Sequence, residues 1–305
     1  MRAEIESVGD LRFDDGSPVR SASAIAPFGD GWLVAQDDAT HAAWWRPEGV
    51  SPVRVLEAVD GHEVFSAAEG TKHLKPDFET ACDVRIHGGA GVVLLGSGST
   101  SARMRASVVR LTSSGPRFDV VALDPLYHRV AEALGIDLDL LNLEGACLIG
   151  EAFRWFNRGN LGANLLSASV DLPVTELAAA LTGSVAPQEV KVTDRRVYDL
   201  GDVDGVGLAV TDAVALPDGR ILLSAAAEDT PNAVDDGPVV GTALALVSGD
   251  DLLAVTQLDA ADGTVHKIEG LGLGEVREDG VRLVAVVDAD DPLVPSVQLS
   301  VRVDW

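Results

Sequence analysis

Five oxygen-bearing side chains recur in the same local setting along this chain. Three are glutamates, each opening a short apolar run, as in Lys267-Ile268-Glu269-Gly270-Leu271. Two are hydroxyl residues in a comparable setting. The five positions are Ser21, Glu79, Glu144, Thr211 and Glu269. An all-oxygen ligand set selects hard cations, and a wide, flexible ring of about six to eight ligands suits Ca²⁺ better than Mg²⁺. Brought together, these side chains predict a calcium site completed by water.

The spacing of these positions indicates the architecture that must hold them. They lie roughly 57 to 67 residues apart, counting from the last through the C-terminus back to the first. Each is followed by a turn and a second, more apolar run, and repeats of this length built from short strands are typical of β-propellers. We therefore predict one all-β domain over residues 1–305, a five-bladed β-propeller with four-stranded antiparallel blades. The blades start near residues 21, 79, 144, 211 and 269.

The two ends of the chain predict how the ring closes. Residues 3–8 and 297–303 both alternate apolar and polar side chains, as strands with one buried face do. We expect the N-terminal strand to close the last blade as its outer strand, which removes free sheet edges. Residues 126–140 and 173–181 predict two short helices in the connections between strands.

A propeller would bring the five positions to one mouth of its central channel. The first strand of each blade lines the channel, so its start lies on the same face as the end of the second strand. Three glutamates converging on one axis require either a proton or a cation. The alternative is a polar channel that simply holds water. Lys267 stands two residues before Glu269 and faces the same way, either as a salt-bridge partner of a ring carboxylate or as an anion contact.

Other charged residues are expected around the same mouth. Several cations near one mouth of so acidic a protein predict an anionic ligand, although each alone is equally a solvated surface charge. A carboxylate at the rim would serve as general base; no serine lies in a nucleophile-elbow sequence, and the catalytic residue stays unassigned. The predicted substrate contacts are Lys267, Arg158, Arg103, Lys75, Asp37, Glu228 and Asp288.

Composition narrows the classes of partner. The net charge is −25, from 23 Lys and Arg against 48 Asp and Glu, so the surface repels phosphate backbones and nucleic acid is excluded as a partner. The same charge either serves solubility alone or concentrates cations. No stretch reaches the roughly 18 apolar residues of a membrane helix, so no membrane partner is expected. The acidic start lacks an apolar signal region, which predicts a cytoplasmic protein. A protein partner is not excluded.

The two cysteines occupy equivalent positions. Cys82 and Cys147 each follow their glutamate by three residues, so they should fill the same small buried slot in adjacent blades. Neighbouring inner strands splay too far apart there for the narrow geometry of a disulfide. We predict two free thiols.

Three resemblances to known families rest on these motifs. The ring order of hydroxyl, Glu, Glu, hydroxyl, Glu resembles the calcium-activated nucleotidases (apyrases), whose Lys-x-Glu-Gly pattern matches residues 267–270. That resemblance implies a five-bladed propeller with Ca²⁺ in its channel and carries the metal role onto the five ring positions. The Glu-Gly openings also resemble bacterial phytase-like propellers. The segments 75–79 and 96–99 resemble an uncharacterised bacterial propeller family over essentially the full chain, which implies no particular activity.

Two functions follow. One is a Ca²⁺-dependent hydrolase of a small anionic, phosphorylated substrate, in which the metal polarises an oxygen and activates water. The alternative is a non-catalytic propeller that binds a ligand or a protein, with a structural axial metal that joins the blades. A third possible function is a sugar-lactone hydrolase, but the metal sites of such enzymes mix Asn and Asp with Glu, and the predicted ring has no Asn. An open metal position beneath a cleft with basic residues would favour the enzyme, and a metal fully closed by protein ligands would favour the scaffold.

Overall fold

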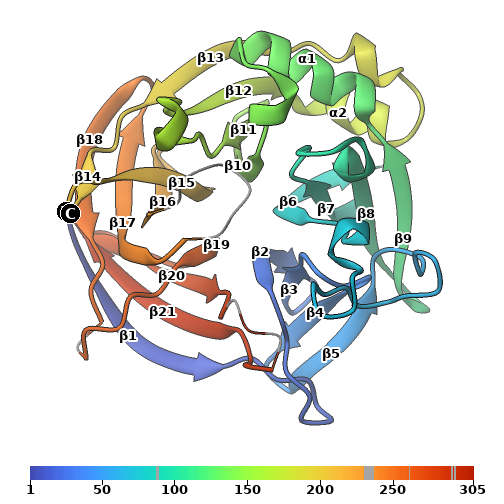
Figure 1. The fold of residues 1–305 in the computed structure, drawn as a ribbon, viewed down its shortest axis with the longest axis horizontal. Coiled ribbons are helices and arrows are strands. Elements are labelled where there is room, and N and C mark those ends of the chain that lie inside the picture. The colour runs from blue at the N-terminus through green and yellow to red at the C-terminus, as the bar shows by residue number, and fades with distance from the viewer. Residues whose placement is uncertain (87–88, 230–236, 261, 290, 292) are drawn as a thin grey trace.

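The predicted five-bladed propeller is confirmed by a computed structural model of the chain. Its description covers residues 1–305 except 87–88, 230–236, 261, 290 and 292. Five antiparallel sheets stand around a central channel, and the innermost strand of each faces the axis (Figure 1). No helix in the described part of the chain is long and apolar enough to cross a membrane.

The blades follow one another along the chain. The first comprises β2 (Ala22–Phe28), β3 (Gly31–Gln36), β4 (His41–Arg46) and β5 (Gly49–Arg54). The second comprises β6 (Phe78–Ile86), β7 (Gly89–Gly96), β8 (Arg105–Thr112) and β9 (Gly115–Ala122). The third comprises β10 (Leu143–Ile149), β11 (Ala152–Asn157), β12 (Ser167–Pro173) and β13 (Thr193–Tyr198). The fourth comprises β15 (Val206–Ala215), β16 (Ile221–Glu228), β17 (Val239–Ser248) and β18 (Asp251–Gln257), with the two-residue β14 (Asp202–Val203) beside β15.

The fifth blade joins both ends of the chain, as expected. It contains β19 (Ile268–Arg277), β20 (Gly280–Val287) and β21 (Val297–Asp304), and its outer strand is the N-terminal β1 (Arg2–Asp10). β1 runs antiparallel to β21 with Ala3 opposite Val303. A bare edge presents unpaired N–H and C=O groups to which another chain can add, so this pairing closes the ring and covers β21.

Two helices lie outside the second and third blades. They are α1 (Asp124–Leu134) and α2 (Val174–Leu181), accompanied by the short 3₁₀ segments Lys72–Leu74, Ser101–Arg103, Leu138–Leu140, Leu161–Ala163 and Pro187–Glu189. Both predicted helices are therefore present, although α1 begins two residues earlier and ends before residue 140. It ends at Gly135, which takes a left-handed φ of 69° that glycine adopts without a steric penalty.

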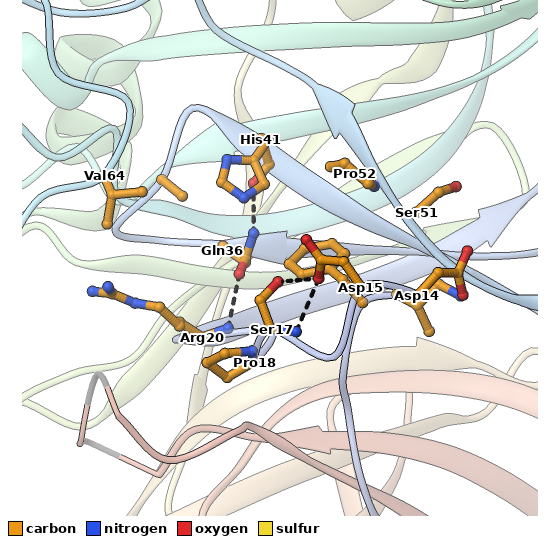
Figure 2. Close-up of a pocket in the computed structure, with 13 residues that line it drawn as sticks. Asp14, Asp15, Ser17, Pro18, Arg20, Gln36, His41, Ser51, Pro52 and Val64 are labelled. Carbon is orange, nitrogen blue, oxygen red and sulfur yellow. Dashed lines mark hydrogen bonds between the residues drawn. The ribbon is translucent and has the colours of Figure 1, made fainter.

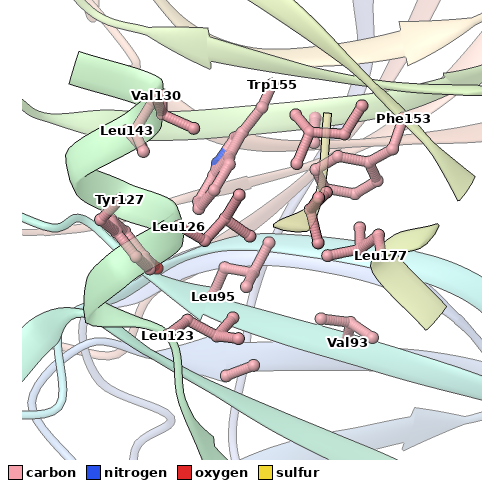
Figure 3. Close-up of a cluster of buried hydrophobic side chains, with 14 of the residues drawn as sticks. Val93, Leu95, Leu123, Leu126, Tyr127, Val130, Leu143, Phe153, Trp155 and Leu177 are labelled. Carbon is pink, nitrogen blue, oxygen red and sulfur yellow. The ribbon is translucent and has the colours of Figure 1, made fainter. Parts of the chain in front are cut away.

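A large hydrophobic cluster between these helices and the two blades holds the inner strands in place (Figure 3). Tyr127 of α1 packs edge-on against Trp155 of β11, with ring centroids 4.9 Å apart. The Trp155 indole N–H donates to the Thr80 hydroxyl at 3.2 Å, and Thr80 in turn donates to the backbone oxygen of Glu144 at 2.6 Å. Apolar packing thereby extends to the start of β10, where the predicted ligand Glu144 lies. Cys82 and Cys147 are both buried free thiols, as predicted.

Each innermost strand carries a β-bulge close to its start. The pairing register shifts by one residue in every blade, which leaves one residue unpaired and turns side chains relative to a regular ladder. The unpaired residues are Ser23, Glu79, Gly145, Thr211 and Glu269.

The bulges correct the predicted alignment of the first blade. Ser23, not Ser21, is the unpaired residue corresponding to Glu79. Ser21 instead corresponds to Asp77: the two have positive φ values of 43° and 56°. Each also accepts a backbone N–H from the residue after the second strand. The residue of the first blade that corresponds to Thr211 is therefore Ser23, two positions after the predicted Ser21.

Candidate functional site at the channel mouth

One group of charged residues lies where the first and second blades meet at the mouth. The Lys75 ammonium contacts the carboxylates of Asp37 and Asp77, the latter at 2.6 Å. Arg103 contacts the other Asp77 oxygen at 2.9 Å and donates to Ser99 at 2.8 Å. We call these residues, together with Glu79, the first network.

Backbone geometry places the first network. Asp37 directly follows β3, and its carbonyl oxygen accepts the N–H of Asp77 at 3.0 Å. Asp77 holds a left-handed backbone conformation, which aspartate tolerates better than most residues. Its side chain also accepts a hydrogen bond from the Ser97 hydroxyl. The turn before β6 therefore brings two aspartates from consecutive blades against one lysine.

A second network joins the third, fourth and fifth blades. Arg158, which follows β11, contacts Glu144 at 3.2 Å and also Glu228 at the end of β16. Lys267, which precedes β19, contacts Glu228 at 3.2 Å and Glu269 at 2.9 Å. The charges alternate along this chain of ion pairs, so each cation links carboxylates from neighbouring blades.

Burial and neighbouring charges shift the pKa values of these groups. Burial raises the pKa of Glu144 to about 7, opposed by Arg158 and reinforced by Glu269. Burial likewise raises the pKa of Asp37 to about 6, opposed by Lys75 and reinforced by Asp77. For Glu228 burial works in the same direction, but Arg158 and Lys267 outweigh it and lower the pKa to about 2.

Glu79 stands apart from the other carboxylates. Burial raises its pKa well above the usual range, and the charges of Asp77 and Asp37 add to the effect, with a smaller contribution from Glu144. Within the described residues its carboxylate takes part in no ion pair or hydrogen bond. Glu144 is bound on one side only: Oε1 accepts from Asn142 at 2.8 Å, whereas Oε2 is buried and has no hydrogen-bond partner.

Carboxylates outnumber cations at the mouth. The described residues contribute four cationic side chains to the two networks, Lys75, Arg103, Arg158 and Lys267, and six carboxylates, Asp37, Asp77, Glu79, Glu144, Glu228 and Glu269. The predicted anion contacts are thus all engaged with acids of the same mouth, and Lys267 forms the salt bridge to the ring carboxylate Glu269. Such an excess of buried carboxylates requires either a proton on one of them or a bound cation.

The grouping closest to a metal-ligand geometry differs from the predicted ring. Asp37, Asp77 and Glu79 each offer an oxygen within 4.8 Å of the others. Only Glu79 belongs to the five predicted ligands. Lys75 forms ion pairs with both aspartates, so its ammonium already compensates part of their negative charge.

The remaining predicted residues have other surroundings. The Thr211 hydroxyl is buried and donates to the backbone oxygen of Ile268 at 2.6 Å, so it joins the inner strands of two blades. Ser21 occupies the turn position described above. Asp288 is half-buried directly after β20, the equivalent end of the fifth blade.

Sequence reasoning missed Asp212. This buried carboxyl accepts the backbone N–H of Leu271 at 2.6 Å, joining the fourth and fifth blades, and burial raises its pKa well above the usual range. The inner strands β10 and β15 approach so closely here that a Cβ added to Gly145 would lie 2.4 Å from the Asp212 Cα. The Glu-Gly pairs at 144–145 and 269–270 were the available signal, since glycine permits such an approach.

The fold and the mouth together define a five-bladed β-propeller with a buried ionic network at one end of its channel. The chain belongs to a family of unknown function, DUF6910, whose model matches residues 71–292.

Comparisons with solved structures find proteins of low sequence identity to this chain. A mannose phosphorylase from Leishmania mexicana, in complex with a phosphate ion, is 12% identical, covering 99% of this chain and 89% of that one, with a TM-score of 0.48. A GH62 hydrolase in complex with xylotriose is 9% identical over 97% and 95% of the two chains, also with a TM-score of 0.48. A putative gluconolactonase is 12% identical over 98% and 92%, with a TM-score of 0.43. No curated protein matches the sequence.

Proposed function

We propose that the channel mouth binds a divalent cation, with Ca²⁺ as the expected ion. The observation that carries this is the excess of two carboxylates over cations in the two networks. Like charges held close together in a buried site recruit either a proton or a cation. The unpartnered oxygens are those that a cation would use: the carboxylate of Glu79 and Oε2 of Glu144.

The donor set fits a hard cation. Glu79 and Glu144 supply carboxylate oxygens from adjacent blades, and Glu269 contributes its charge to the same region. Carboxylates and water are the ligands that Ca²⁺ accepts in flexible geometry. When bound, the ion would polarise a substrate oxygen. Lys75 and Lys267 neutralise the flanking acids, so the ion is expected between the networks rather than in place of either lysine.

Thermal unfolding with and without Ca²⁺ tests this proposal. Chelator-treated wild type should gain several degrees in Tm on adding Ca²⁺, because ligand at about 100 times Kd stabilises the folded state by about 2.7 kcal/mol. Glu79→Gln and Glu144→Gln should lose most of that gain. Glu132→Gln, an exposed change in α1, should keep it. Absence of a shift in wild type, or equal shifts in all four proteins, would contradict the proposal.

A second candidate function is hydrolysis of a small anionic, phosphorylated substrate. The observation favouring it is that the four predicted anion contacts do gather in ion pairs at one mouth. Arg158 and Lys267 would exchange a carboxylate partner for a substrate oxygen, and Asp37 at the rim would accept a proton. The test is phosphate release from a panel of phosphate esters and anhydrides, with Lys267→Gln as the variant. Calcium binding without turnover would instead support the non-catalytic propeller.

A further inference from the structure

A cavity of about 540 Å³ lies between the first blade and the connector that leads into it. The connector is the segment 11–20, which crosses from the fifth blade to the first. Figure 2 shows its residues Asp14, Asp15 and Arg20 on one side of the cavity and His41 and Val64 on the other. Small-molecule sites in proteins commonly have volumes of about 300–1,000 Å³.

The walls of the cavity are held in place by hydrogen bonds. Asp14 and Val50 exchange two of them: the Asp14 N–H donates to the Val50 oxygen at 2.9 Å, and the Val50 N–H donates to Asp14 Oδ1 at 2.8 Å. The Gln36 side chain accepts the Arg20 N–H and donates to the His41 carbonyl oxygen, both at 2.8 Å. The connector is therefore fastened to β3, β4 and β5, and the cavity does not depend on a flexible lid.

Apolar atoms provide most of the surface that lines the cavity. One aromatic ring, Phe13, lies with its centroid 5.7 Å from that of the His41 imidazole. Burial lowers the pKa of His41, so the imidazole is neutral at neutral pH and adds no charge to the wall. The other apolar lining residues are Pro18, Ala39, Val50, Pro52 and Val64. These walls suit the apolar part of a ligand.

The charged lining residues favour a positive ligand. Arg20 is paired with Asp38, so its charge is compensated. Asp14 and Asp15 are exposed at the edge of the cavity, and neither has an ion pair within the described residues. The Ser17 hydroxyl and N–H both donate to Asp15 Oδ1 and lower its pKa, which keeps the carboxylate ionised. Two negative charges therefore stand beside apolar walls with one aromatic face, a surrounding that attracts ammonium groups.

We propose that this cavity binds a small organic ammonium ion with an apolar body. The body lies against Phe13, Val50 and Val64, and the ammonium group lies at the Asp14 and Asp15 edge. The cavity is lined by the connector, the first blade and Val64 of the segment that follows β5. None of these lining residues belongs to either network at the channel mouth, so this site is separate from it. Binding bridges the crossing segment and the blade that it enters, so it also stabilises closure of the ring.

Phenethylamine is a suitable probe, compared with its neutral analogue 2-phenylethanol and its acidic analogue 3-phenylpropanoate by calorimetric titration. We expect phenethylamine to bind about tenfold or more tightly than either analogue, and to raise the Tm. Equal binding of the three compounds, or no binding of phenethylamine, would overturn the proposal.

Three variants locate the site. Asp15→Asn keeps the acceptor for Ser17 but removes the charge, so it should weaken phenethylamine binding about fivefold and leave 2-phenylethanol unchanged. Val64→Trp fills the cavity from its half-exposed side and should abolish binding of both compounds. Asp30→Asn removes the same charge from a surface turn outside the cavity and should change neither. Unaltered phenethylamine binding in both Asp15→Asn and Val64→Trp, with folding confirmed by thermal unfolding, would refute the site.

Discussion

Arg158 is the residue whose removal tests the ionic network most directly. Its guanidinium is the direct ion-pair partner of Glu144 and shares Glu228 with Lys267. The side chains of those two glutamates are only 7% and 5% exposed. Substitution Arg158→Met keeps an unbranched apolar stem and removes the charge. Glu144 is then left buried with no cation in contact, and Glu228 keeps only Lys267.

The expected cost is large for a single side chain. Breaking one partner of a buried ion pair costs about 3–5 kcal/mol, because the remaining charge is stranded away from water. A chain of 305 residues unfolds with an entropy of about 0.6 kcal/mol/K, so each kcal/mol lowers the Tm by about 1.5 °C. The Tm of Arg158→Met should therefore fall by about 5–8 °C in a calorimetric scan of chelator-treated protein.

Two further variants make this expectation specific. The double variant Arg158→Met/Glu228→Gln should recover part of the loss, since one of the two affected carboxylates becomes neutral. Arg110→Met removes an arginine whose ion pair with Asp119 is exposed, and such pairs contribute only about 0–1 kcal/mol. The reasoning fails if Arg158→Met unfolds within about 1 °C of wild type, or if Arg110→Met lowers the Tm by as much.

Three other predictions concern the same mouth. Burial raises the pKa of Glu144 to about 7, so between the ordinary carboxyl pKa and about pH 7 the folded state holds a proton that the unfolded chain has released. Without Ca²⁺, the free energy of unfolding should therefore fall as the pH rises through this range. The fall should be less steep in Glu144→Gln. Gly145→Ala places a Cβ 2.4 Å from the Asp212 Cα and should cost about 1–3 kcal/mol in chemical denaturation, whereas Gly89→Ala, with a nearest contact of 3.7 Å, should cost less; equal costs would contradict the close approach. Thr211→Val should lower stability by about 1–3 kcal/mol yet retain the Ca²⁺-dependent Tm shift, and loss of that shift would instead make Thr211 a metal ligand.

Much of the architecture was accessible from local patterns. Bladed repeats, the alternating strands at the two ends and the helices in the connections are properties of nearby residues, so their spacing is visible in the chain. The convergence of Glu144, Glu228, Glu269 and Lys267 followed from the same logic. The starts of the first strands and the ends of the second strands of all blades must lie at the same mouth once the ring is closed.

The register of the first blade was not accessible in the same way. A β-bulge adds one unpaired residue without changing the apolar pattern on either side. Ser21 and Ser23 are both hydroxyl residues two positions apart, so either fits a repeat counted by residue type. Only the pairing of β2 with β3 shows that Ser23 is the bulge residue.

For the channel mouth, the sequence predicts which residue types gather there, whereas the tertiary structure determines which of them are in contact. Residue types and repeat spacing are enough to place carboxylates and cations at one end of a five-bladed ring, because strand alternation and ring closure are geometric consequences of the chain. Which carboxylate contacts which cation depends on where side chains from neighbouring blades meet. Lys267 lies 3.2 Å from Glu228 although the two belong to different blades, and the energy of such a contact falls off steeply with distance. Tertiary packing alone therefore decides that Lys267 also pairs with Glu228 and that Thr211 joins two strands. It also decides that, among the described residues, one oxygen of Glu144 is buried without a hydrogen-bond partner.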